Sequence, residues 1–150
     1  MNFEFSFVAL LLLIMLFVPN ILWSRCPPKD YEKHSKNENR ILLALERIGE
    51  ILVVVFSLFC GVNFSLNLFL ILVFAVMLIY EAYWVRYFTG SKTMHDMYES
   101  FCHVPLPGAT LPVFSFLLLG FCANDVLLIL SSLVLGIGHI GIHYFHNAEL

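Results

Sequence analysis

Three histidines near the C-terminal end of the chain are the residues whose type and spacing most directly suggest chemistry. His139, His143 and His146 are separated by four and three positions inside an apolar segment. On a helix this spacing places them on one face. Imidazoles so arranged can ligate a divalent metal or, beside a carboxylate, relay a proton near neutral pH. Because an ionisable side chain is costly inside a bilayer, the segment predicts either a site or a structural polar contact.

Two carboxylates have the same predicted depth as the first of these histidines. Counting at about 1.5 Å per residue from the outer end of each apolar run places Glu50, Glu81 and His139 about 18 to 20 Å inward. We predict that Glu50, Glu81, His139 and His143 line a pocket that binds a divalent metal such as zinc, or another cation. Glu81 and His139 are the predicted catalytic groups, because they lie too deep to extend easily into headgroups. The substrate is not indicated.

Three further residues are candidates for binding an anion, such as phosphate or a lipid headgroup. The segment VPLPGATLP, residues 104–112, predicts a helix N-terminus, whose free N–H groups and positive dipole end attract anions. Thr110 lies in this segment, and Arg47 and Arg86 are the nearby cations expected to assist. A turn that binds nothing is the alternative, since proline and glycine also begin helices without a ligand.

Composition identifies the class of protein. Hydrophobic residues make up 60% of the 150 positions and charged residues 13%, so the apolar side chains cannot all be hidden in one water-soluble core. The net charge of −3 argues against nucleic acid as a partner, because no basic face is available for phosphates. The four cysteines form no CxxC or CxxCH motif, so neither a redox pair nor attached haem is indicated. The length predicts one domain, residues 1–150.

Five apolar runs approach the roughly 20 residues that a helix needs to cross a bilayer. We therefore predict an all-α integral membrane protein, a compact bundle of five transmembrane helices. The predicted helices span residues of about 3–23, 38–62, 66–88, 107–122 and 126–146. Ser35 and Glu38 have the spacing of a capping box at the start of the second helix. Pro112 predicts a kink in the fourth.

The basic residues predict the orientation of the bundle. All eight lysines and arginines lie in or beside the loops 24–37 and 89–106, and the other connections contain none. The positive-inside rule therefore makes both loops cytoplasmic, with the N-terminus outside and the C-terminus in the cytoplasm. The aromatic cluster YEAYWVRYF, residues 80–88, is interpreted as an aromatic belt at the membrane edge. The predicted location is a membrane that the chain crosses several times.

Three functions are compatible with this pattern. The leading hypothesis is a small polytopic membrane protein with an inner-leaflet Glu/His pocket, open to the cytoplasm, for membrane-embedded chemistry. The second is an accessory subunit of a larger complex, in which polar stripes only join helices. The small residues Ser132 and Gly136 favour such packing. The third is a proton-coupled transporter acting as a homodimer, because five helices are few to enclose a path. The sequence leaves open whether the chain is an enzyme.

Overall fold

The computed structural model describes residues 4–29, 31, 38–64 and 67–150, which form six helices with no β-strands among them. The helices are α1 (Phe7–Arg25), α3 (Arg40–Leu58), α4 (Leu68–Thr89), α5 (Met94–Tyr98), α6 (Pro107–Ala123) and α7 (Val126–Ala148). Within this part of the chain, α1, α4 and α7 are long and apolar enough to cross a membrane. The prediction of an all-helical membrane protein is supported at this level.

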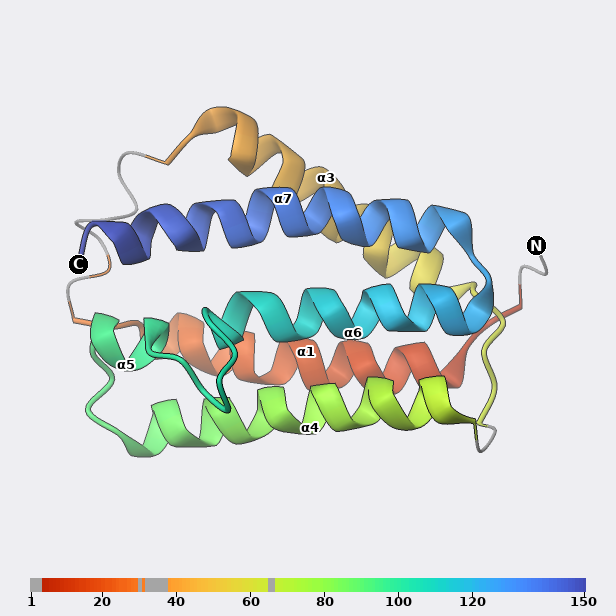
Figure 1. The fold of residues 1–150 in the computed structure, drawn as a ribbon, viewed down its shortest axis with the longest axis horizontal. Helices are drawn as coiled ribbons and strands as arrows, with labels where there is room; N and C mark the ends of the chain where they lie inside the picture. Colours follow the sequence, from red (N-terminus) through yellow and green to blue (C-terminus); the bar gives the residue numbers. More distant parts are fainter. Residues whose placement is uncertain (1–3, 30, 32–37, 65–66) are drawn as a thin grey trace.

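The long helices lie alongside one another and alternate in direction. Following the colours from red to blue, α1, α3, α4, α6 and α7 run back and forth along the long axis of the molecule (Figure 1). The chain therefore starts at one end of the bundle and finishes at the other (Figure 1). Helix α6 packs against both α4 and α7, whereas α3 crosses the far side of α7. The turns that reverse the chain bring residues distant in sequence to the same end of the bundle.

Helix α3 is shorter than predicted at both ends. It begins at Arg40, where the Asn39 side chain caps it by accepting a 2.8 Å hydrogen bond from the Ile41 N–H. Ser35, from the expected capping box, lies outside the described residues. The helix ends at Leu58 rather than at residue 62. The predicted extent was wrong there because apolar composition alone does not mark the end of a helix.

The chain beyond α3 is held by the N-terminal segment. The Leu58 carbonyl accepts a 2.8 Å bond from the Ser6 N–H, and the Ser6 hydroxyl donates to the Val62 carbonyl at 2.7 Å. Gly61 has φ of 68°, a left-handed conformation that glycine adopts without strain, and its N–H donates to the Glu4 carbonyl. These bonds satisfy backbone groups that would otherwise extend the helix, so they fix its end.

Two glycines set the close crossing of α3 and α7. A Cβ atom added at Gly138 of α7 would lie 2.3 Å from the Glu46 nitrogen, and one at Gly49 of α3 would lie 2.5 Å from the Leu135 Cα. No real side chain tolerates such distances from backbone atoms. Absence of a side chain at these positions lets the two helices touch through their backbones. The crossing places residues 42–50 of α3 directly beside residues 135–141 of α7.

The aromatic residues at the end of α4 point inward, which corrects the interpretation of this cluster as a membrane-edge belt. Tyr80, Tyr83 and Tyr87 are fully buried, and Trp84 is only 4% exposed. Their spacing of three, one and three residues is the spacing of one helix face. A belt would instead place its rings outward, among lipid headgroups. The rings therefore belong to the interior of the bundle.

Candidate functional site

A cavity of about 320 Å³ lies between the helices, at the end of the bundle where the C-terminus is found. Its size is at the lower limit of the roughly 300 to 1,000 Å³ typical of small-molecule sites. Side chains reach it from α1, α3, α4, α5, α6 and α7. The charged and imidazole groups that line it are Glu38, Glu46, Arg47, Glu50, His139 and His143. It is thus a polar space inside an otherwise apolar bundle.

The shortest polar contact in this cavity joins α3 to α7. Nδ1 of His139 lies 2.5 Å from Oε1 of Glu46. Both side chains are largely shielded, with 24% and 11% of their surfaces exposed. His139 directly follows Gly138, so the close helix crossing is what brings the imidazole to the carboxylate. When His139 is protonated the contact is an ion pair, and the bond is charge-assisted.

Further titratable groups continue from His139 toward the C-terminus of α7. The ring of His143 lies 4.6 Å from that of His139, and the ring of Tyr98 lies 5.6 Å from that of His143. The Tyr98 hydroxyl and His146 Nδ1 share a 3.2 Å hydrogen bond, and His146 Nε2 is 3.5 Å from a Glu38 carboxylate oxygen. Burial raises the pKa of the Tyr98 hydroxyl, so it is protonated at neutral pH. These groups form a row in which His143 makes ring contacts and His146 is hydrogen-bonded to Tyr98.

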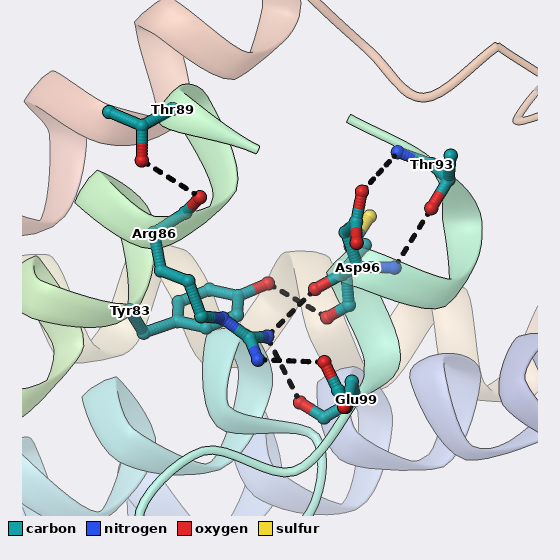
Figure 2. Close-up of polar contacts among 7 residues, drawn as sticks. Tyr83, Arg86, Thr89, Thr93, Asp96 and Glu99 are labelled. Atoms are coloured by element: carbon teal, nitrogen blue, oxygen red, sulfur yellow. Dashed lines mark hydrogen bonds and ion pairs between the residues drawn. The ribbon is translucent and has the colours of Figure 1, made fainter. Parts of the chain in front are cut away.

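A short helix, α5, is fixed against the side of the cavity by residues of α4. Arg86 Nη1 pairs with the Glu99 carboxylate at 2.9 Å, and Nη2 donates to the Asp96 carbonyl at 2.9 Å (Figure 2). The Tyr83 hydroxyl donates to the Met97 carbonyl at 2.8 Å. The guanidinium also lies 5.7 Å from the Tyr83 ring centre. These contacts hold the last turn of α5 where its side chains line the cavity.

The start of α5 is closed by a capping box. The Thr93 hydroxyl accepts the Asp96 N–H at 3.1 Å, and the Asp96 carboxylate accepts the Thr93 N–H at 3.0 Å (Figure 2). The hydrogen bond from the Thr93 backbone, with smaller help from its hydroxyl, His95 and Arg86, lowers the pKa of Asp96 below its ordinary value. The carboxylate is therefore ionised when the helix is formed at neutral pH.

Four of the seven predicted site residues line this cavity, and Glu81, Arg86 and Thr110 do not. His139, His143, Glu50 and Arg47 are all in its wall. The Glu50 carboxylate pairs with the Arg47 guanidinium at 3.1 Å, on the more exposed side. Glu81 is not among the lining residues, and its Oε1 atom is buried with no hydrogen-bond partner among the described residues. Helix α6 lies between α4, which carries Glu81, and α7 (Figure 1).

The two remaining predicted ligand-binding residues have structural contacts of their own. Arg86 uses both terminal nitrogens on α5, as described above. The Thr110 hydroxyl donates to the carbonyl of Leu106, at 2.6 Å, and to that of Pro105. Thr110 also lines a separate apolar groove between α6 and α7 rather than the cavity. Neither residue lies in the same wall as the histidines.

The expectation of a metal site is not supported. Across the described residues, no group of three or more His, Cys, Asp and Glu side chains is arranged to hold a metal ion. The physical reason lies in the contacts already given. His139 Nδ1 is bonded to Glu46 and the Glu50 carboxylate is paired with Arg47, so these atoms already have partners other than a shared ion. Glu81 is on a different wall of the bundle.

The cavity contains groups that the sequence analysis did not select. Glu46, rather than Glu50, meets His139, and the rings of Trp23, Trp84 and Tyr98 line the same space. For Trp84 a signal was present, because it shares one helix face with the other buried rings of α4. Tyr98 had no comparable signal, since its position depends on the contacts that hold α5 to α4.

The fold and the cavity define a helical membrane protein with a carboxylate- and aromatic-lined chamber at one end of its bundle. Comparisons with known protein families, with curated proteins and with solved structures found no match for this chain. Its function is accordingly argued from its own residues.

Proposed function

We propose that the chain is a single-domain, five-span membrane protein whose Glu/His cavity opens to the cytoplasm and binds a cation. Counting α3 as a span is supported by its outer face, where Ile41, Ile48 and Ile51 are exposed, while Glu46 is buried. The isoleucines are suited to lipid, and the exposed Arg47 guanidinium, paired with Glu50, would extend toward the headgroups. Helix α6, with 17 residues, has a length of about 26 Å, and its neighbours α4 and α7 cover much of its surface.

The proposed orientation has the N-terminus outside and the C-terminus in the cytoplasm. It is supported by the alternating directions of the five long helices, which bring the ends of the chain to opposite ends of the bundle (Figure 1). The basic residues that flank the described helices gather at the C-terminal end. They are Arg25, Lys29, Arg40, Arg86 and Lys92. Positive charge beside membrane spans marks the cytoplasmic side, so the cavity would open there.

The charge of the cavity supports a cationic ligand. Three carboxylates, Glu38, Glu46 and Glu50, and one guanidinium, Arg47, line it, which gives a formal charge of −2 with neutral histidines and −1 when His139 is protonated. Low-dielectric walls focus such a charge and favour a positive guest. The observation that carries the proposal is the shielded pair of Glu46 and His139 at 2.5 Å. A cation can bind the Glu46 carboxylate because its partner, His139, becomes neutral when it loses a proton.

The same pair links cation binding to protons. With His139 protonated, its charge and that of Glu46 compensate each other. A cation that approaches the Glu46 carboxylate competes with the imidazolium, because two positive charges beside one carboxylate repel. His139 then releases its proton, which leaves through the cavity mouth. Binding of the cation is therefore accompanied by proton release, as a proton-coupled carrier or a proton-transferring enzyme requires.

Proton release from the purified full-length protein tests this proposal. The protein in weakly buffered detergent solution, with a pH-sensitive dye, receives chloride salts of potassium, ammonium, methylammonium and tetramethylammonium over about pH 5 to 8, where histidines titrate. At least one cation should release protons saturably. The Glu46→Gln variant should lose this release, because the carboxylate for which the proton and the cation compete is gone.

Glu81→Gln is the matched control, since it neutralises a carboxylate in the neighbouring α4 that does not line the cavity. It should release protons as the wild type does. A wild-type protein that binds none of the cations, or a Glu46→Gln protein that responds normally, would refute the proposal. Thermal unfolding of each variant without added cation verifies that it is folded.

The second candidate is an accessory or dimerising role, and the groove between α6 and α7 favours it. This groove has a volume of about 640 Å³ and an almost wholly apolar lining that includes Ser132 and Gly136. Small residues in such a groove let another helix approach closely. Native mass spectrometry distinguishes this candidate: a specific dimer or complex that Gly136→Leu dissociates supports it, and a monomer in both proteins opposes it.

A further inference from the structure

Aromatic rings line much of the cavity. A site that bound a cation through carboxylates alone would not need them. Five rings contribute to its wall, in addition to the histidines. They are Trp23, Tyr31, Tyr83, Trp84 and Tyr98. The rings come from α1, from the segment before α3, from α4 and from α5. Because several separate elements supply them, the aromatic character belongs to the chamber and not to the face of one helix.

The rings are packed at angles to one another. Trp23 and Tyr31 meet edge to face, with ring centres 4.9 Å apart and planes at 88°. Tyr83 and Trp84 lie 5.2 Å apart, with planes at 60°. Rings turned in this way present both edges and faces to the space beside them. The face of an aromatic ring attracts a cation, most strongly where water is excluded.

Aromatic walls select among cations. A metal ion or a small hydrated ion needs oxygen or nitrogen ligands to replace its water, and ring faces are poor replacements. An ammonium group that carries methyl groups is weakly hydrated, so it loses less on entering an aromatic chamber. The carboxylate of Glu46, 11% exposed, supplies the opposite charge without needing direct coordination. The lining therefore fits an organic ammonium cation better than an inorganic one.

One indole group indicates a second feature of the ligand. The Nε1 atom of Trp23 is buried and meets no acceptor among the described residues, whereas the Trp84 N–H has the Tyr80 hydroxyl beside it. Both residues line the cavity, and Trp84 is only 4% exposed. A buried N–H without an acceptor is unfavourable, and native proteins rarely leave one so. An oxygen atom of a bound molecule would satisfy such a donor.

We infer that the cavity binds an N-methylated ammonium cation that also carries an oxygen acceptor, the chemistry of choline and of phosphatidylcholine headgroups. This inference rests on the proposed cation-binding role and specifies its ligand. The ammonium group lies among the rings near Glu46, and the oxygen accepts from the indole N–H of Trp23. The chamber, at about 320 Å³, is in the size range of sites for small molecules.

The tryptophans provide a direct measurement, because Trp23 and Trp84 are the only two in the sequence and both line the cavity. The full-length protein in phosphatidylglycerol nanodiscs is titrated with choline chloride, and separately with potassium chloride at the same ionic strength. Choline should change the tryptophan fluorescence saturably. Potassium should not, because the rings discriminate against a hydrated ion.

Substitutions at Trp84 test the contribution of its ring. Trp84→Leu removes the ring and should weaken choline binding about tenfold, whereas Trp84→Phe keeps an aromatic ring and should weaken it by a smaller factor. Trp23 remains as the reporter in both variants. Tyr144→Leu is the control, since Tyr144 is 61% exposed and lines the separate groove between α6 and α7. Its choline affinity should equal that of the wild type.

The source of the ligand is distinguished by the lipid of the nanodisc. If a headgroup occupies the cavity, phosphatidylcholine discs alone change the fluorescence relative to phosphatidylglycerol discs, and added choline has a further effect only in the latter. If the ligand is a free solute, choline acts equally in both. Failure of choline and of phosphatidylcholine to change the fluorescence, or an unaltered Trp84→Leu protein, overturns the inference.

Failure of this inference differs from failure of the proposed function. If potassium releases protons in a Glu46-dependent manner, while choline neither releases protons nor changes the fluorescence, the cation role stands and the aromatic selectivity is refuted. If no cation releases protons or changes the fluorescence, both are refuted.

Discussion

Glu46 and His139 are 93 positions apart in the chain, yet their side chains meet at 2.5 Å across the crossing of α3 and α7. No local sequence interaction can produce such a contact. It exists because Gly49 and Gly138 allow two helix backbones to touch. The pair is therefore a sensitive indicator of the packing of these helices and of the charge inside the cavity.

Breaking this pair from one side should destabilise the protein. Glu46→Gln or His139→Gln leaves a shielded polar group without its charged partner, at a cost of about 1 to 3 kcal/mol. This is less than for a fully buried pair, because His139 is 24% exposed. The double variant should be more stable than the sum of the two losses predicts. Unfolding of all four proteins in detergent gives the coupling energy, and simple additivity would mean that the contact is not made.

Enlarging Gly138 should open the helix crossing. In Gly138→Val the new Cβ would lie 2.3 Å from the Glu46 nitrogen, so α3 must move and the carboxylate leaves His139. We expect a loss of about 2 kcal/mol or more. Gly136→Ala is the control, because its Cβ would meet only side-chain atoms, of Val113 at 3.1 Å and of Ile140 at 3.9 Å. Thermal unfolding measures both, and equal small losses in the two variants would argue against the close crossing.

The depth of a charged residue could be predicted from the sequence, but the partner could not. Glu50 is assigned to the level of His139 by counting twelve residues from 62, the expected end of its helix. The helix ends at Leu58, and the residue twelve before it is Glu46. An error of one turn in the predicted end of the helix therefore assigns Glu50 instead of Glu46 to the level of His139. Hydrogen bonds from the N-terminal segment set that end, and these are long-range contacts.

The depth of a residue in the membrane also does not determine which side of its helix faces the cavity. Glu81 is fourteen residues from Asn67, close to the thirteen that separate His139 from Val126, and so has nearly the same depth. It nevertheless lies outside the cavity, because α6 separates α4 from α7. The order in which helices pack depends on the whole set of interfaces. The positions of five of the helices were predicted to within a few residues because hydropathy is a property of each segment alone.

Loss of the Arg86 side chain should release α5 from α4. Arg86→Gln removes the ion pair to Glu99 and the hydrogen bond to the Asp96 carbonyl. The ion pair is half-exposed, so global stability should fall by no more than about 1 to 2 kcal/mol. Hydrogen exchange of residues 94–98 should rise much more than that of α4. Glu99→Gln, which keeps the bond to the carbonyl, should have a smaller effect. Unchanged exchange in Arg86→Gln would show that other contacts hold α5.

Acid should loosen the same short helix through Asp96. Its pKa is lowered in the folded protein, chiefly by the Thr93 N–H, so its contribution is present above the unfolded value of about 3.8 and is lost as pH falls below it. The protection factor of the Met97 amide, which corrects its exchange rate for the intrinsic effect of pH, should therefore fall as the pH is lowered below about 3.8. Asp96→Asn should abolish this dependence. Thr93→Ala, which retains the backbone donor, should keep it, and identical acid profiles in the two variants would contradict the assignment.

Two exposed cysteines allow the proposed orientation to be tested. Cys26 follows α1 and Cys102 follows α5, both at the end of the bundle proposed to face the cytoplasm. Proteins with a single cysteine at either position, in spheroplasts of a bacterial host, should resist a membrane-impermeant maleimide until the membrane is opened. An Asn63→Cys protein without native cysteines should react at once, because residue 63 is exposed between α3 and α4 at the opposite end.

The three positions together separate the possible topologies. If Cys26 and Cys102 react without opening of the membrane and residue 63 is protected, the bundle has the opposite orientation and the cavity opens to the outside. Protection of one native cysteine and reaction of the other would place them on different sides. The count of five spans would then be wrong. Helices α3 and α4 lie between the two cysteines, and if both cross the membrane the chain returns to the side from which it started. The expected pattern is the one in which the basic residues and the cavity mouth share the cytoplasmic side.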